Sequence, residues 1–169
     1  SRRGGVPDVA GGRVEAEGFL DDHGFEGSAP VRVHATVGVE DGVLVVDLTG
    51  SADEVPSGMN VPVSSAHAAA YFAVRAFVGP EVPMNAGLAS RVRLVLREGS
   101  LFHPRFPAAL SARHLAVQRL TDVLVEALSA LLPARSTDRA LCVGFATELC
   151  GRDGFGWNRR LSIMAKVSA

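Results

Sequence analysis

Apolar and polar residues alternate along several short stretches of the first half of the chain, and this pattern predicts β-strands. The clearest stretch is residues 31–38, where valine or alanine at odd positions alternates with polar residues or glycine at even ones. An Asp-Gly pair at 41–42 separates it from a second apolar run over 43–49, which predicts a β-hairpin. Residues 13–20 and 91–97 are predicted to form two further strands.

Two longer segments have the residue spacing of helices. Residues 64–77 contain small residues around Tyr71 and Phe72, a serine can cap the start, and Gly79-Pro80 ends the pattern. Residues 114–132 contain the longest apolar period of the sequence, and a proline follows directly. We predict a helix in each segment.

Glycine, proline and short polar residues separate these elements, and they predict loops at 50–62, 83–87 and 102–107. Two more strands are predicted at 140–150 and 157–167, joined by a glycine-rich turn at 151–156. The expected fold class is α+β, with a mostly antiparallel sheet packed against two helices. We expect residues 13–169 to form a single domain and residues 1–12 to form a flexible arm.

Composition narrows the classes of function. The chain has 169 residues, of which 47% are hydrophobic and 21% charged, and this composition excludes a disordered polymer. Seventeen basic residues against 18 acidic ones give a net charge of -1, so we expect neither nucleic acid nor an anionic membrane as a partner. The sequence contains no apolar run of 18 residues, and we expect a cytoplasmic protein.

Cysteine and histidine spacing argues against a disulfide and against a metal site. If residues 141–150 form one strand, Cys142 and Cys150 lie about 26 Å apart, far beyond the roughly 7 Å that a disulfide allows. The five histidines show none of the spacings typical of metal ligands, so no metal site is predicted in this chain. A glycine loop followed by Lys and Ser or Thr is also missing, so we predict no bound cofactor, ATP included, in this chain.

Polar side chains in loops and at helix starts are the candidate binding residues, because binding groups concentrate there. They are Asn60, Asn85, Arg113, Gln118 and Arg119. A structural role, in which the asparagines stabilise turns and the arginines brace loops, is an open alternative. No catalytic residue is identified from spacing.

Several short segments occur in an order that resembles the hydantoinase B family. They are Glu17–Gly24, Val46–Ser51, Gly58–Asn60 and Pro83–Gly87, followed by the most specific stretch, Glu98–Ala109, and then by Ala112–His114 with Gln118-Arg119. The family includes subunits or domains of N-methylhydantoinase, 5-oxoprolinase and acetone carboxylase. The resemblance is clear from Arg13 to Leu132 and weaker to Val167, and it corresponds to the central segment of longer proteins. His103 stands where asparagine is more usual, and Ala116-Val117 stand where small hydroxyl residues are more usual.

The resemblance implies a segment or small subunit of an ATP-dependent cyclic amide hydrolase or related carboxylase. ATP and a divalent metal would then lie on partner segments, and the chain would work as a homo-oligomer or with an ATP-binding subunit. It also implies that the five candidate residues share one pocket for a small-molecule substrate, where arginine binds a carboxylate or phosphorylated intermediate and asparagine binds a lactam carbonyl. The alternative is a reduced, non-metal module for ligand binding, assembly or natural-product modification.

Overall fold

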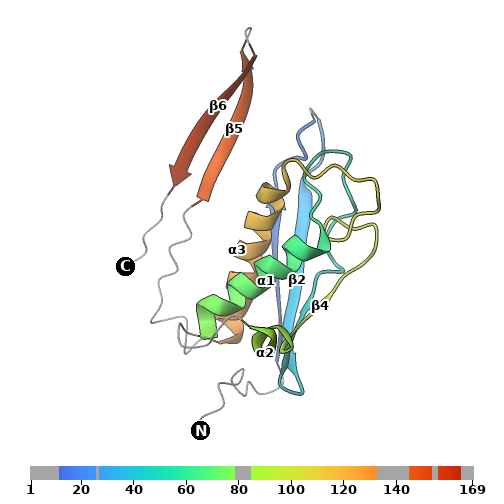
Figure 1. The fold of residues 1–169 in the computed structure, drawn as a ribbon, viewed down its shortest axis with the longest axis vertical. Coiled ribbons are helices and arrows are strands. Elements are labelled where there is room, and N and C mark those ends of the chain that lie inside the picture. Colours follow the sequence, from blue (N-terminus) through green and yellow to red (C-terminus); the bar gives the residue numbers. More distant parts are fainter. Residues whose placement is uncertain (1–11, 26, 79–84, 133–144, 154–155, 165–169) are drawn as a thin grey trace.

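The computed structural model describes residues 12–25, 27–78, 85–132, 145–153 and 156–164. Its main part is a four-stranded sheet with helices on one face, and a separate two-stranded sheet comes from the last third of the chain (Figure 1). The four strands follow one another across the sheet in chain order: β1 (Arg13–Leu20), β2 (Val31–Glu40), β3 (Val43–Asp47) and β4 (Val92–Val95).

The sheet is mixed but mostly antiparallel, which confirms the expected α+β class. β1 pairs with β2 and β2 with β3 in antiparallel fashion, whereas β4 runs parallel to β3. The parallel pairing follows from the connection between the two strands, because α1 (Val63–Val78) and the short α2 (Ala86–Ala89) return the chain to the end where β3 begins.

The β2–β3 hairpin forms where the Asp-Gly pair predicts it. Asp41 and Gly42 both have positive φ angles, 50° and 73°, as in a type I′ turn. Glycine adopts this conformation without steric cost, and its twist matches that of the flanking strands. β2 extends to Glu40, two residues beyond the alternating pattern.

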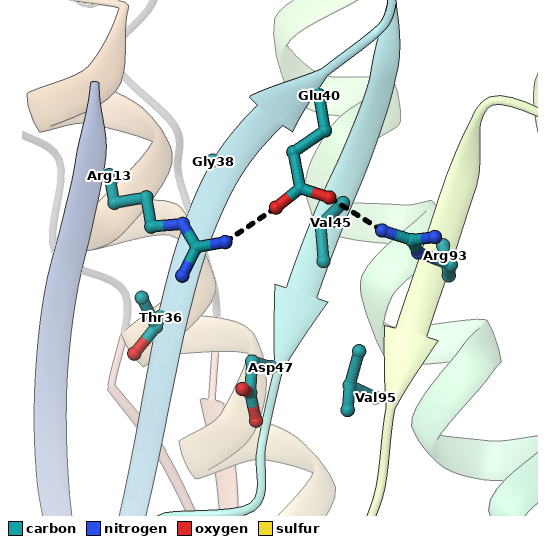
Figure 2. Close-up of a pocket in the computed structure, with 8 residues that line it drawn as sticks. All are labelled: Arg13, Thr36, Gly38, Glu40, Val45, Asp47, Arg93 and Val95. Carbon is teal, nitrogen blue, oxygen red and sulfur yellow. Dashed lines mark hydrogen bonds and ion pairs between the residues drawn. The ribbon is translucent and has the colours of Figure 1, made fainter. Parts of the chain in front are cut away.

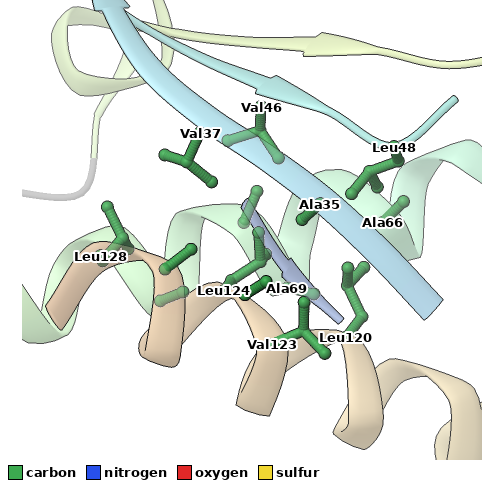
Figure 3. Close-up of a cluster of buried hydrophobic side chains, with 14 of the residues drawn as sticks. Ala35, Val37, Val46, Leu48, Ala66, Ala69, Leu120, Val123, Leu124 and Leu128 are labelled. Atoms are coloured by element: carbon green, nitrogen blue, oxygen red, sulfur yellow. The ribbon is translucent and has the colours of Figure 1, made fainter. Parts of the chain in front are cut away.

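Two helices cover one face of the sheet. The longer one, α3 (Arg113–Leu131), crosses β1 and β2, and α1 packs beside α3 (Figure 1). Figure 3 shows side chains of both helices meeting the inner face of β2 and β3. The buried residues of α3 recur at helical spacing, as the apolar period predicts: Leu120, Val123, Leu124, Ala127, Leu128 and Leu131.

Three elements differ from the sequence-based expectation. The pattern predicts a loop at residues 85–87, but Asn85 caps α2, and the pattern misses this helix because it is a single turn that contains glycine. β4 is shorter than predicted. β5 (Phe145–Asp153) and β6 (Gly156–Met164) form an antiparallel pair whose strands extend into the segment expected to be a turn. The expected arm at 1–12, apart from Gly12, and Cys142 lie outside the described residues.

Candidate functional site at the loop end of the sheet

The segments that carry the motifs gather at one end of the four-stranded sheet, which we call the loop end: the end where β1 finishes, β2 begins and β3 finishes. The loop after β3 pairs back onto β2, since the Ala52 N–H donates to the Arg32 carbonyl at 2.9 Å. The loop after β4 pairs with the same segment, since the Leu101 N–H donates to the Ala52 carbonyl at 3.0 Å. The Val61 N–H then donates to the Leu101 carbonyl at 2.8 Å, directly before α1 begins.

Arg97 ties the two interlaced loops together. Its guanidinium forms an ion pair with the Asp53 carboxylate at 2.7 Å and donates a hydrogen bond to the Ser51 carbonyl at 3.2 Å. Ser51 in turn imitates a strand residue, because its hydroxyl accepts a hydrogen bond from the His34 N–H and donates one to the His34 carbonyl. The loop end is therefore held by side-chain as well as backbone hydrogen bonds.

Asn60 is an internal brace of the loop end. Its side chain is 1% exposed. The amide oxygen accepts a hydrogen bond from the Val55 N–H at 2.8 Å, and the amide nitrogen lies within 2.7–3.2 Å of the carbonyl oxygens of Val55, Ser57 and Ala109. Because the amide nitrogen has two hydrogens for these three acceptors, its donor capacity is filled within the chain.

Asn85 lies at the opposite end of the sheet. Its side-chain oxygen accepts hydrogen bonds from the backbone N–H groups of Gly87 and Leu88, which makes it the N-cap of α2. The chain leaving α2 bonds to Leu44 at the start of β3, near the β2–β3 turn. The contacts at Arg32 and at Leu44, which pairs with Val39, are seven residues apart along β2, or roughly 23 Å. The structure therefore does not bring Asn85 together with Asn60.

The three candidates on α3 lie in its first two turns, near the loop end. Arg113 is exposed, and its guanidinium donates to the Leu110 carbonyl at 3.1 Å. Gln118 is half-buried. Arg119 packs along Gly18 of β1, and its guanidinium lies 3.9 Å from the Asp122 carboxylate. Of the five predicted residues, Asn60 and Arg113 are thus brought into adjoining loops, because the Ala112 N–H donates to the Gly58 carbonyl at 2.9 Å.

Asp122 is the ionisable group whose titration the surroundings clearly alter. Burial raises the pKa of the Asp122 carboxyl above its usual range, and the Arg119 guanidinium lowers the same pKa by a smaller amount. The carboxylate is partly exposed and lies mid-helix on α3. Its position next to Arg119 and Gln118 makes the first half of α3 the charged part of the candidate site.

A hollow of about 260 Å³ opens at the loop end, where α1 begins. Its walls are mostly apolar and come from Pro62, Val63, Pro104, Phe106, Ala108 and Leu110. Its two polar side chains are His103 and Arg105. Both residues belong to the motif segment 98–109, but spacing does not single them out, because only the fold places residues 103–110 against the start of α1.

A second hollow, of about 280 Å³, lies on the outer face of the sheet (Figure 2). Arg13, Gly38, Val45 and Arg93 form one row across the four strands. The Glu40 carboxylate accepts hydrogen bonds from Arg13 at 2.5 Å and from Arg93 at 2.6 Å. The charges at the upper rim of this hollow are therefore paired within the sheet, and we assign the candidate site to the loop end.

Two further observations bear on cofactors and on unsatisfied polar groups. The side chains that the structure describes include no group of three or more His, Cys, Asp or Glu residues that could hold a metal ion. They therefore do not fit the divalent metal that the resemblance places on partner segments, and no chemical step is assigned to such a metal. At the loop end, the hydroxyls of Ser57 and Ser100 are buried without a hydrogen-bond partner among the described residues, which is uncommon in folded domains.

No helix in the described part of the chain combines the length and the hydropathy that crossing a membrane requires.

Comparison with known proteins agrees with the motif pattern. The family profile described as Hydantoinase B/oxoprolinase matches residues 3–152. A D-/L-hydantoinase subunit of Pseudomonas sp. strain NS671 is 31% identical over 141 residues, which cover 78% of this chain and 24% of that protein. A 5-oxoprolinase of Dictyostelium discoideum is 29% identical over 146 residues, which cover 83% of this chain and 11% of that protein.

One solved structure has the same fold. The crystal structure of an ATP-dependent caprolactamase from Pseudomonas jessenii superposes with a TM-score of 0.68 at 20% identity, over 90% of this chain and 26% of that one. The chain thus spans about a quarter or less of the length of these similar proteins. Since the family profile covers most of its length, the chain belongs to the hydantoinase B/oxoprolinase family.

Proposed function

We propose that this chain is the hydantoinase B segment of an ATP-dependent hydrolase of small cyclic amides, and that it works together with partner segments or chains. The family supports the class of reaction, since its members include a hydantoinase subunit and 5-oxoprolinases. The caprolactamase of the same fold is ATP-dependent, which supports ATP on a partner. An ATP-coupled role also implies a cytoplasmic location.

The observation that carries this proposal is the assembly of the loop end from the family's motif segments. Residues 98–103 pair with residues 51–54, Asn60 joins both to the loop before α3, and α1 and α3 begin beside them. Loops held by a rigid sheet are where binding groups concentrate. We therefore place the contribution of this chain to the substrate site, or to the partner that completes it, at the loop end.

Within this proposal the predicted site residues have two kinds of role. Arg113, Gln118 and Arg119 are proposed to contact the substrate or a phosphorylated intermediate, because they lie on the surface of α3 near the loop end. Asn60 and Asn85 are proposed to act indirectly, as positioning residues, because their side chains already bond to the backbone.

The test is to purify the protein from its source cells with its associated chains and to assay ATP-dependent hydrolysis of caprolactam, 5-oxoproline and hydantoin. We expect phosphate release that depends on one of these amides in the assembly, and none with the 169-residue chain alone. If the intact assembly contains no ATP-binding chain and hydrolyses none of the three, the proposed function is wrong.

The substrate-binding role is tested in the same assembly with Arg113→Gln. We expect KM for the amide to rise about tenfold, since a charge-assisted hydrogen bond is worth roughly 1.5–3 kcal/mol before solvent screening reduces it. Arg91→Gln is the matched control, because Arg91 is exposed and lies beside Leu44 at the other end of the sheet. Equal kinetics for the two variants would exclude Arg113 from the site.

A further inference from the structure

The geometry of the hollow at the loop end points to a ligand of defined chemistry: we infer that it binds a small carboxylate carried on an aliphatic body. This inference concerns binding by the chain itself and goes beyond the proposed function. Opening a lactam ring by hydrolysis produces a carboxylate on an aliphatic chain, so the ligand class matches the expected product. Only that link to the product rests on the proposed function.

The charge of the hollow favours an anion. Its polar side chains are Arg105 and His103, and none of the described residues that line it is acidic. The nearest competing carboxylate is that of Glu54, which lies 3.7 Å from the Arg105 guanidinium. This ion pair is loose, because the other oxygen of Glu54 accepts a hydrogen bond from the Arg105 backbone N–H at 2.7 Å. A guanidinium has five N–H donors, so Arg105 keeps donors available for a second carboxylate.

The backbone around the hollow contributes in the same direction. α1 begins at Val63, on the wall of the hollow, and its first turn contains no acidic residue. The first N–H groups of a helix have no partner within the helix. These groups add to the Arg105 and His103 contribution and would not by themselves make a site.

The apolar wall of the hollow requires the aliphatic part of the ligand. Phe106 is 99% exposed, the largest exposed fraction of any large apolar side chain in the described part of the chain. It lies beside Pro104, Ala108 and Leu110. Covering such a surface with methylene groups is favourable by about 0.8 kcal/mol for each buried CH₂. A bare anion would leave this surface exposed, whereas an alkyl carboxylate would cover part of it.

The size of the hollow limits the ligand. At about 260 Å³ it is smaller than the roughly 300–1,000 Å³ typical of sites for drug-sized molecules. A ligand of about eight heavy atoms, such as hexanoate, suits this space better than a nucleotide or a peptide. With so few atoms and an open site, we expect a dissociation constant of about 1 mM.

The experiment titrates the isotope-labelled full chain, whose mass is 17.7 kDa, with hexanoate and follows backbone amide resonances by NMR. We expect saturable shifts at Val63, Arg105 and Leu110, and weaker binding at high salt because the charges are partly exposed. Hexanamide and hexan-1-ol have the same alkyl chain without the charge, and acetate has the charge without the chain. Binding of any of these three as tight as that of hexanoate overturns the inference.

Two variants assign the binding to Arg105. Arg105→Gln is expected to weaken hexanoate binding about tenfold, whereas Arg91→Gln should leave it unchanged. Glu54→Gln removes the competing carboxylate while keeping an acceptor for the Arg105 N–H, and it is expected to tighten binding two- to threefold, by about the energy of an exposed ion pair. Unchanged affinity in both Arg105→Gln and Glu54→Gln overturns the inference. This result would leave the proposed function standing, since that proposal is tested by turnover of the assembly.

Discussion

The side-chain nitrogen of Asn60 donates a hydrogen bond to the carbonyl oxygen of Ala109, 49 residues further along the chain, at 3.2 Å. This contact joins the loop before α1 to the loop before α3. Both loops belong to segments that carry the family motifs, and both border the hollow at the loop end. The shape of the candidate site therefore depends on a residue that has no free group for a ligand.

Replacing Asn60 should destabilise the whole domain. Asn60→Asp places a carboxylate against three carbonyl oxygens and removes the donor that they share. We expect a loss of about 3 kcal/mol or more in the free energy of unfolding, because buried acceptors lose their partner and a buried charge is left unpaired. Urea denaturation measures the loss. A decrease below about 0.5 kcal/mol would show that the loops are held together by other contacts.

Asn85→Ala should have a milder and more local effect. The variant removes the N-cap of a four-residue helix, and helix caps contribute about 1 kcal/mol. We expect a decrease of about that size in the free energy of unfolding, and faster amide hydrogen exchange at Gly87 and Leu88. Asn85→Ser provides the control, since serine is also a good N-cap and should retain most of the stability.

Gly58 allows the loop before α1 to touch the start of α3. A Cβ at this position would lie 2.2 Å from the Ser111 hydroxyl oxygen and 3.1 Å from the Ala112 backbone nitrogen. We expect Gly58→Ala to cost about 1–3 kcal/mol, because the loop must move away from α3. Adding Ser111→Gly removes the closest clash and should recover part of the loss when the midpoint of thermal unfolding is measured. If the single and double variants unfold at the same temperature, the loop does not approach α3 closely.

Asp122 should make stability fall as pH rises. Burial raises the pKa of Asp122 in the folded state, so the unfolded chain loses this proton at lower pH than the folded one. The associated stability is complete below the unfolded pKa, near 3.9, and is lost as pH rises through the folded pKa. Asp122→Asn should therefore be more stable than the natural protein at pH 7, with the difference disappearing near pH 3. Urea midpoints at both pH values measure this.

Glu126→Gln is the matched control for the Asp122 experiment, because Glu126 is exposed on the same helix. We expect it to show no comparable gain at pH 7. A stability loss in Asp122→Asn that is equal at both pH values would mean that the carboxylate acts as a hydrogen-bond acceptor rather than as a buried charge.

Glu40→Gln should change stability only slightly, although Glu40 bridges two arginines across the sheet (Figure 2). The side chains of Arg13 and Arg93 are mostly exposed, and exposed ion pairs contribute about 0–1 kcal/mol each. We expect a loss of under about 1 kcal/mol at low salt that disappears in 1 M NaCl. A larger loss that persists in salt would mean that the outer face is held by more than surface charge.

Local patterns in the sequence determined much of the fold. β1 has the predicted bounds, Asp41-Gly42 forms the predicted turn, and the apolar period of α3 faces the sheet. Each of these depends on residues close together in the chain, whose spacing alone places apolar side chains on one face or permits a tight turn. The ordered motifs likewise led to the family, which the profile match over residues 3–152 establishes.

Only the tertiary structure decided how these elements are used. Local pattern cannot tell that β4 pairs in parallel with β3, because strand partners are chosen by contacts across a connection of more than forty residues. Nor can it distinguish a ligand-binding asparagine from a bracing one: Asn60 and Asn85 look alike in sequence, but the fold surrounds each with different backbone groups. The hollow with Arg105 and His103 exists because residues 103–110 fold back onto the start of α1, a long-range contact that no periodicity records.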